Sequence, residues 1–371
     1  MIKVLHYLRH LGLGGTEKTC QLFFEHADRS KFEVAVAYEK SGTHPRLEEF
    51  QKGAEVCGGK LFEIDSRPVH DTDYFSKKEF NGTGLQAVVD DFKPDILHVY
   101  RSGYHEFPSP GHHVNVPHFV ETNVFGFYDN NPKIDRTLFM SKWLMDFASR
   151  QLGIKHNRFD FVNNPVEMPR VFDELAITQR WKAEGATVVG RCGRPDNGIY
   201  NSLNVESVRL LRMQGYDIRF VVVAPPSNML DDLARHEIPF YVIEPTTNPI
   251  VLSTFYNSVD IYTHARADGE TFGVNIAEAM IHGKPVITHI AVPSVPGMGV
   301  FQSQTELVAH AETGFIVQNN PAEYADALKH LIDNPDTRRK MGEAGKRKAE
   351  AEYEVKACMS KLERIYQEIV L

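Results

Sequence analysis

Short apolar segments alternate with amphipathic segments of helical length along most of this chain. The first pair is an expected strand at residues 2–8 and an expected helix at 16–27, and the alternation continues to residue 162. Parallel strands buried on both faces read as short apolar runs, and each needs a crossover helix to reach the next strand. The pattern therefore predicts an α/β fold with doubly wound parallel sheets.

The alternation is interrupted once. From Asn163 to about Gln179 the chain is polar, contains two prolines and shows no clear period, which is typical of a link between domains. A second series then begins with an expected strand at 187–192. A length of 371 residues suits two domains of roughly 100–200 residues each. We expect a first domain at 1–163, a second at 164–354, and a final helix at 355–371 that packs back on the first.

The composition argues against several classes of protein. The net charge is −8 at pH 7 and the isoelectric point is near 6.1, whereas a nucleic-acid binder usually carries a basic face. The four cysteines are scattered and form no CxxC pair, which suggests reduced thiols. The start of the chain reads as a strand, and no apolar run is long enough to cross a bilayer. We expect a cytoplasmic protein; peripheral contact with a membrane stays open.

A glycine-rich loop, Gly12-Leu13-Gly14-Gly15, follows the first expected strand. Glycines let a backbone approach a ligand closely, and the N-terminus of the next helix favours phosphate. Glu17 occupies the place of the third glycine, so the loop is not the dinucleotide-binding fingerprint. A tight turn without a ligand is an equal alternative.

Arg194 follows the expected strand at 187–192 in the run Gly193-Arg194-Pro195. Open α/β sheets bind ligands beyond the carboxyl ends of their strands. A guanidinium there suits a diphosphate, through bidentate charge-assisted hydrogen bonds. The alternative is an ordinary surface arginine beside a turn.

Two carboxylates, Glu270 and Glu278, flank an expected helix start near Gly273. Glu270 then lies on the preceding loop, and Glu278 lies in the second turn of the helix. The free N–H groups of the first turn can hold an anion between them. The alternative is a glutamate favoured by the helix dipole together with a solvated one.

With their flanking residues, these segments resemble the retaining glycosyltransferases of the GT-B fold, in particular glycosyltransferase family 4. The resemblance covers nearly the whole chain, and its matching motifs occur in the family's order: Gly14-Gly15-Thr16-Glu17-Lys18, Lys93-Pro94-Asp95-Ile96-Leu97-His98, Phe139-Met140-Ser141-Lys142, Asn164-Pro165-Val166-Glu167, Gly193-Arg194, the Glu270–Glu278 run, and Asp333 through Gly345. It implies two Rossmann-like domains, each a doubly wound parallel sheet, that face each other across a cleft.

The resemblance also implies an activity. A hexose would pass from a nucleoside-diphosphate sugar, such as a UDP- or GDP-sugar, to a glycan, lipid-linked or small-molecule acceptor. The anomeric configuration would be retained, without a cofactor or metal. Glu270, Arg194 and Asn123 would act at the reacting centre. The donor would also contact residues of both domains: Gly14, Gly15, Phe272, Gly273, Val274, Asn275 and, at the ribose, Glu278. His98 or His105 would line the acceptor side.

Two positions depart from the family pattern. Ile199 stands where a second diphosphate-binding cation, a lysine, is usual, and Asn123 stands where a histidine is usual. These departures keep open the alternative of a subunit that binds a nucleotide sugar or glycan without turnover. A sugar-nucleotide epimerase of the same fold is a further alternative, and a nearer one than a dehydrogenase. A dehydrogenase, suggested only by the glycine loop and Glu39, is weaker still. We read Asp71-Thr72-Asp73 as an ordinary turn rather than a metal site.

Overall fold

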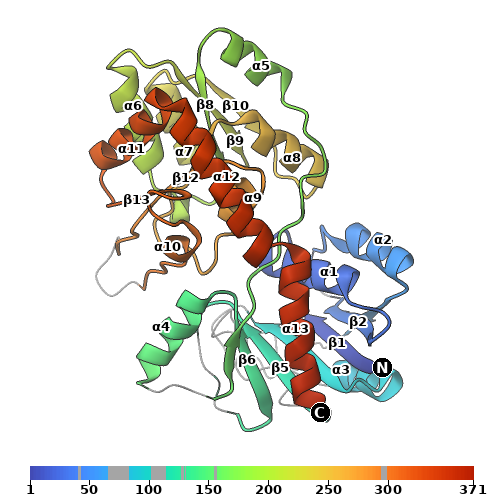
Figure 1. Ribbon diagram of the computed structural model, residues 1–371. Coiled ribbons are helices and arrows are strands. Elements are labelled where there is room, and N and C mark those ends of the chain that lie inside the picture. The colour runs from blue at the N-terminus through green and yellow to red at the C-terminus, as the bar shows by residue number, and fades with distance from the viewer. Residues whose placement is uncertain are drawn as a thin grey trace, which may run out of the picture. The chain divides into compact units, whose positions relative to one another are not determined.

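The computed structural model describes residues 1–40, 43–65, 83–101, 114–126, 129, 131–153, 157–293 and 299–371. The chain forms two compact units (Figure 1). The first comprises Met1–Pro165 together with Val355–Leu371, and the second comprises Val166–Glu354. This division falls two residues after the boundary expected from the sequence, and the last helix belongs to the first unit.

The first unit is built on a seven-stranded sheet with the order β3-β2-β1-β4-β5-β6-β7. All of its paired strands run parallel. Central strands such as β1 are almost continuously apolar, as burial on both faces requires. The strands are β1 (Ile2–Leu8), β2 (Phe32–Glu39), β3 (Lys60–Ile64), β4 (Ile96–Arg101), β5 (His118–Asn123), β6 (Ile134–Phe139) and β7 (Phe159–Phe161).

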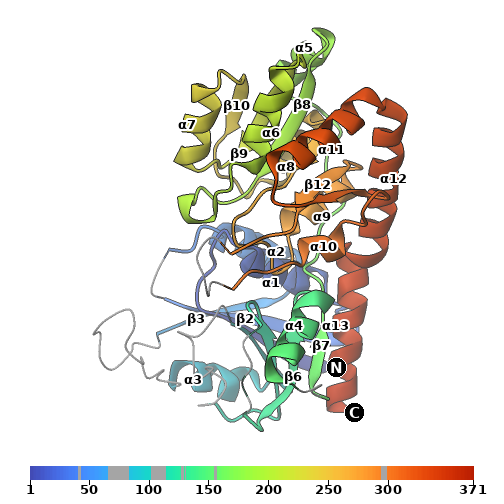
Figure 2. The same ribbon diagram turned by 90° about the vertical axis from the view of Figure 1, so that its left-hand side faces the viewer.

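Helices cover both faces of this sheet. One face is packed by α1, α2 and the C-terminal helix α13, which shares its core with β1 and β2; Figure 1 shows α13 running beside α1. The opposite face is packed by α3, which Figure 2 shows on the other side of β2. The helices of this unit are α1 (Gly15–His26), α2 (Leu47–Cys57), α3 (Thr83–Phe92), α4 (Lys142–Leu152) and α13 (Val355–Val370).

The second unit repeats this plan with a six-stranded sheet in the order β10-β9-β8-β11-β12-β13. Its paired strands are again parallel. The strands are β8 (Thr187–Cys192), β9 (Ile218–Val223), β10 (Phe240–Ile243), β11 (Ile261–Thr263), β12 (Val286–His289) and β13 (Gly314–Val317). The two sheets confirm the predicted doubly wound α/β fold.

One helix of the second unit lies where the sequence predicted only a link. Helix α5 begins at Ala176 and buries the side chains of Thr178 and Trp181. Two buried residues three positions apart are too few to show a helical period in the sequence. The helices are α5 (Ala176–Ala183), the 3-10 turn η3 (Asn197–Ile199), α6 (Leu203–Arg212), α7 (Ser227–Arg235), α8 (Pro249–Ser258), α9 (Val274–Ile281), α10 (Gln304–Leu307), α11 (Pro321–Asp333) and α12 (Pro335–Glu352).

The strand order fixes where each unit can bind a ligand. In the second sheet, β8 and β11 are neighbours although the chain leaves them in opposite directions, towards β9 and towards β12. Such a switch point opens a crevice beyond the carboxyl ends of the two strands. The loops after β8 and β11 therefore frame the expected site in this unit.

None of the helices in the described part of the chain combines the length and the low polarity that crossing a bilayer requires.

Candidate functional site

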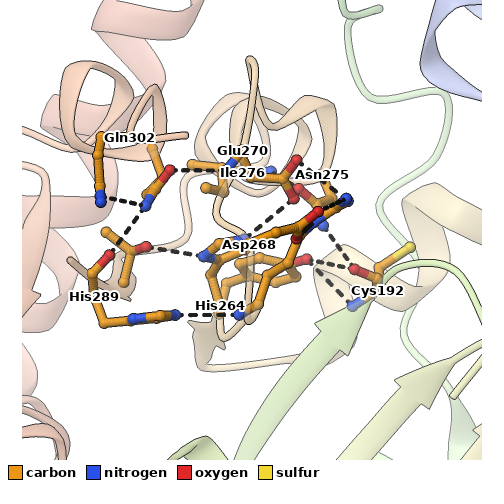
Figure 3. Close-up of polar contacts among 12 residues, drawn as sticks. Cys192, His264, Asp268, Glu270, Asn275, Ile276, His289 and Gln302 are labelled. Carbon is orange, nitrogen blue, oxygen red and sulfur yellow. Dashed lines mark hydrogen bonds and ion pairs between the residues drawn. The ribbon is translucent and has the colours of Figure 1, made fainter. Parts of the chain in front are cut away.

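The loop between β11 and α9 carries Glu270 at the switch point of the second unit (Figure 3). Two glycines in left-handed conformations turn the chain on either side of it. Gly269 has φ of 69°, and a Cβ there would lie 1.8 Å from the carbonyl oxygen of Phe301. Gly273 has φ of 101° and caps the start of α9. The two turns require glycine, because other residues rarely adopt this backbone conformation.

Hydrogen bonds from the start of α10 and its N-cap hold the backbone of Glu270. Its N–H donates to Oε1 of Gln304 at 3.0 Å, and its carbonyl accepts from the N–H of Ser303 at 3.0 Å. Gln304 is fully buried and donates onward to the carbonyl of His289 at 3.2 Å. The position of Glu270 is therefore fixed by β12 and α10 as well as by its own loop.

The carboxylate of Glu270 has a partner on each oxygen. Oε1 lies 3.2 Å from Nε2 of His264, and Oε2 lies 3.6 Å from Nη1 of Arg266. Burial alone would raise the pKa of Glu270, but the charge of Arg266 and the hydrogen bond with His264 outweigh it and lower the pKa to about 2. The side chain is 13% exposed. Glu270 is thus a fixed anion that a ligand can still reach.

Two buried imidazoles support this arrangement. Nδ1 of His264 lies 2.9 Å from Oγ1 of Thr288, so both ring nitrogens of His264 are engaged. His289 accepts the backbone N–H of Arg266 on Nε2 at 3.2 Å. Burial lowers the pKa of His289 to about 4, so this ring is neutral at pH 7 and can accept that bond.

Glu278 lies in the second turn of α9, as the predicted helix start requires. Its Oε2 accepts a hydrogen bond from the hydroxyl of Tyr256 at 2.8 Å, and Tyr256 is buried in α8. The side chain of Glu278 is half-buried. Along the chain, the two carboxylates therefore flank the N-terminus of α9: Glu270 precedes the helix, and Glu278 lies within it.

The residues between the two carboxylates divide into packing and polar roles. The ring of Phe272 is buried edge-on against Tyr353, with centroids 5.5 Å apart. Nδ2 of Asn275 donates to the carbonyl of Cys192 at 2.8 Å, which ties α9 to the end of β8. The backbone N–H groups of Val274 and Asn275 open the helix and have no acceptor within it. These N–H groups, rather than the side chains, can meet an anion.

Three arginines interact electrostatically with Glu270. Arg194 is exposed on the loop after β8, and its charge helps to lower the pKa of Glu270. Arg191 is buried, and burial lowers its pKa; its Nη1 donates to the carbonyl of Ala224 at 3.4 Å. The third, Arg266, comes from the β11–α9 loop.

The sequence motifs do not single out Arg266 or His264. Their spacing in the sequence does not show that the loop of Arg266 meets Ile199, but the N–H of Ala267 donates to the carbonyl of Ile199 at 3.1 Å. The residue after Arg266 therefore contacts the position at which the family's lysine is absent, and the charge of Asp196, from the same loop as Ile199, acts on Arg266. The signal that could have found it is the segment Arg266-Ala267-Asp268-Gly269-Glu270 itself, with two carboxylates and a cation on one loop.

The predicted residues of the first unit are more enclosed. Asn123 ends β5 and is buried; its Nδ2 donates to Glu121 Oε1 at 3.4 Å, and its Oδ1 accepts from the N–H of Phe125 at 3.3 Å. His98 does not line a pocket, because it is fully buried with Nε2 2.7 Å from Thr122 Oγ1 and Nδ1 bonded to the hydroxyl of Tyr366. It is a core residue that helps to attach α13.

Other predicted positions in the first unit are placed as follows. Gly14 caps α1 and Gly15 begins it. A Cβ at Gly14 would lie 2.5 Å from the carboxylate of Glu17, so that carboxylate packs over the loop where the glycines were expected to meet a diphosphate. Glu39 is buried and accepts from the hydroxyl of Tyr7 at 2.7 Å. His105 and Asp71-Thr72-Asp73 lie outside the described residues.

Across the residues that the structure describes, no group of three or more His, Cys, Asp or Glu side chains is arranged to hold a metal ion.

Part of the second unit matches a known protein family. Residues 202–348 match the family model of glycosyl transferases group 1. The chain is 26% identical over 226 residues to the capsular polysaccharide biosynthesis glycosyltransferase CapM of Staphylococcus aureus, covering 58% of this chain and 52% of that protein. The alignment thus spans about half of that relative.

Solved structures match over nearly the full length. A glycosyltransferase from Rickettsia africae ESF-5 has a TM-score of 0.74 at 15% identity, over 100% of this chain and 98% of that one. HepE of Anabaena, solved with UDP-glucose, has a TM-score of 0.74 at 13% identity, over 99% of this chain and 100% of that one. The chain therefore has the GT-B fold of these glycosyltransferases and carries, within its second unit, a region of the glycosyl transferases group 1 family.

Proposed function

We propose that this protein transfers a hexose from a nucleoside-diphosphate sugar to an acceptor, with retention of anomeric configuration and without a metal. The observation that carries the proposal is the α9 N-terminus, with Glu270 and Glu278 on its two sides and Arg194 nearby. A donor of this class consists of a sugar, a diphosphate and a ribose in that order. Glu270 offers a hydrogen-bond acceptor for the sugar, Arg194 a cation for the diphosphate, and Glu278 a hydrogen-bond acceptor for the ribose. The match of residues 202–348 to glycosyl transferases group 1 supports the same assignment.

The protonation state of Glu270 limits its role. A carboxyl group with a pKa of about 2 carries no proton at pH 7, so it can accept hydrogen bonds from sugar hydroxyls but cannot act as a general acid. The negative charge that develops on the leaving diphosphate would be stabilised by Arg194 and by the N–H groups of α9. The leaving diphosphate would itself take the proton of the acceptor on the same face of the sugar, which gives retention.

A transfer assay tests the proposal. The full chain is incubated with a panel of UDP-, GDP-, ADP- and dTDP-sugars, and donor cleavage is followed with and without glycan, lipid-linked and small-molecule acceptors. We expect cleavage with at least one donor, insensitivity to EDTA, and a product whose anomeric configuration by NMR matches the donor. If the protein neither binds nor cleaves any of the donors, the proposal is refuted. A product with inverted anomeric configuration would refute retention only.

A non-catalytic nucleotide-sugar or glycan-binding subunit is the second candidate. It is favoured by Asn123, whose side chain is buried and bonded within the first unit and stands where the family has a histidine. This role predicts binding of a nucleotide sugar without hydrolysis or transfer. An epimerase would instead convert the donor sugar without any acceptor, which product analysis detects. The acceptor's identity, a cytoplasmic location and peripheral contact with a membrane stay predictions.

A further inference from the structure

Arg266 is held between two carboxylates on its own loop. Its Nε donates to Oδ1 of Asp268 at 2.6 Å, and its Nη2 donates to Oδ2 at 3.0 Å. Its Nη1 lies 3.6 Å from Oε2 of Glu270. The bidentate pair with Asp268 fixes the plane of the guanidinium, and that plane presents the remaining nitrogen to Glu270.

The main chain of this segment is fixed as well. The N–H of Arg266 donates to Nε2 of His289 at 3.2 Å, and its carbonyl accepts from the N–H of Gly269 at 3.3 Å. The side chain is 19% exposed, so the guanidinium is largely removed from solvent. A charge in this setting acts more strongly on its neighbour than a surface charge does.

The groups around Glu270 differ in their influence on its ionisation. Burial opposes ionisation, and the charge of Arg266 is the largest influence in the other direction, ahead of His264 and Arg194. Further charged or titratable groups that face this pair come from β8, the loop after it and β11: Arg191, Asp196 and Tyr262.

We propose that Arg266 is a positioning residue of this site: locked by Asp268, its guanidinium keeps the Glu270 carboxylate ionised and in one orientation. In the transfer reaction, which rests on the proposed function, Arg266 thereby keeps turnover independent of Glu270 protonation at mildly acidic pH. The alternative role is a direct cation for the diphosphate beside Ile199. The geometry favours positioning, because one full edge of the guanidinium is already occupied by Asp268.

Substitution of Arg266 in the full chain separates the two roles. Because an opposite charge at this range moves a carboxyl pKa by about 1–3 pH units, Arg266→Met should raise the acid limb of the kcat–pH profile by about that amount. Activity should return at higher pH, and Arg266→Lys should restore the limb. Affinity for UDP and GDP, measured by calorimetry, should change by less than about threefold, below the tenfold that corresponds to 1.4 kcal/mol.

Two results would overturn the inference. One is an acid limb that does not move in Arg266→Met. The other is a loss of nucleoside-diphosphate affinity of tenfold or more, about 1.4 kcal/mol, with an unchanged pH profile, which would make Arg266 a diphosphate cation. If Arg266→Met does not fold, Arg266→Gln, which can still bond to Asp268, replaces it with the same expected outcomes.

A readout that does not depend on activity keeps the role of Arg266 separate from the proposed function. The carboxyl carbon of Glu270 is observed by NMR in protein labelled with 13C-glutamate, and is assigned by its loss in Glu270→Gln. At about pH 4, near the ordinary pKa of glutamate, it should be almost fully ionised in the wild type and partly protonated in Arg266→Met. This result in a protein that cleaves no donor would refute the proposed function alone, whereas a signal that is the same in both proteins would refute the role of Arg266.

Discussion

Glu270 and Glu121 are both carboxylates largely removed from solvent beside an arginine, one in each unit, and their pKa values move in opposite directions. Burial raises the pKa of Glu121, and the charge of Arg101 does not offset it. The pKa of Glu270 falls to about 2 although burial opposes this. The arginine is nearer in the first unit, with Nη1 of Arg101 3.1 Å from Glu121 and Nη1 of Arg266 3.6 Å from Glu270.

The difference lies in the wider surroundings of each pair. Glu121 is completely enclosed, and Asp129, 3.5 Å from the same guanidinium, adds a second negative charge. Glu270 keeps 13% of its side chain exposed and gains a hydrogen bond from His264 and the charge of Arg194. One adjacent arginine therefore does not define a functional carboxylate. We expect a ligand-binding carboxylate to have surplus positive charge and partial access to solvent as well, because an anion must be both stable and reachable to bind a ligand.

The largest expected effect of this difference is on turnover. Glu270→Gln keeps the shape of the side chain but removes the charge, and should lower kcat by about 100- to 1,000-fold, the usual cost of losing one electrostatic contact in a transition state. The same substitution at Glu121 is the matched comparison and should lower kcat far less. Steady-state kinetics with the active donor decide this. Comparable losses in the two variants would break the distinction between the two carboxylates.

Stability should depend on pH through Glu270. Its pKa in the folded state is about 2, against 4.5 ordinarily, so its contribution is fully present above pH 4.5 and is lost as the pH falls towards 2. Glu270→Gln should therefore lower the free energy of unfolding by about 3 kcal/mol at pH 7, since each pH unit between the two pKa values is worth about 1.4 kcal/mol. Urea titrations at pH 7 and pH 3.5 should show a smaller loss at the lower pH. An equal loss at both would mean that the surroundings of Glu270 do not favour its ionised form.

Glu278 should affect donor affinity more than turnover. Its carboxylate lies in the second turn of α9 and accepts a hydrogen bond from Tyr256 at 2.8 Å, so it is oriented to accept from a ribose hydroxyl as well. Loss of a hydrogen bond to a charged group costs about 1.5–3 kcal/mol, so Glu278→Ala should weaken nucleotide binding by roughly tenfold or more. Tyr256→Phe, which removes only the internal partner, is the control. Calorimetry that finds unchanged UDP and GDP affinities in Glu278→Ala would contradict this role.

The sequence predicted the folds of both units because short apolar strands alternate regularly with amphipathic helices. It also predicted the start of α9, since Gly273 and the residues after it carry a local signal. It did not reveal Arg266, because the hydrogen bond between Ala267 and Ile199 joins two loops that are far apart in the chain. Nor did it show that His98 is a core residue, since its burial depends on Tyr366 from the last helix.

The smallest expected effect is on the stability contributed by Glu121, and it should have the opposite sign with pH. Because its pKa is raised in the folded state, the folded protein holds the proton more tightly, and the contribution of Glu121 falls as the pH rises above its unfolded value. Relative to the wild type, the free energy of unfolding of Glu121→Gln should therefore rise as the pH increases from 4 to 7. Urea titration over this range, beside Glu270→Gln, measures both slopes. If the two slopes have the same sign, the contrast between the two carboxylates is wrong, and Arg101 stabilises Glu121 as an anion after all.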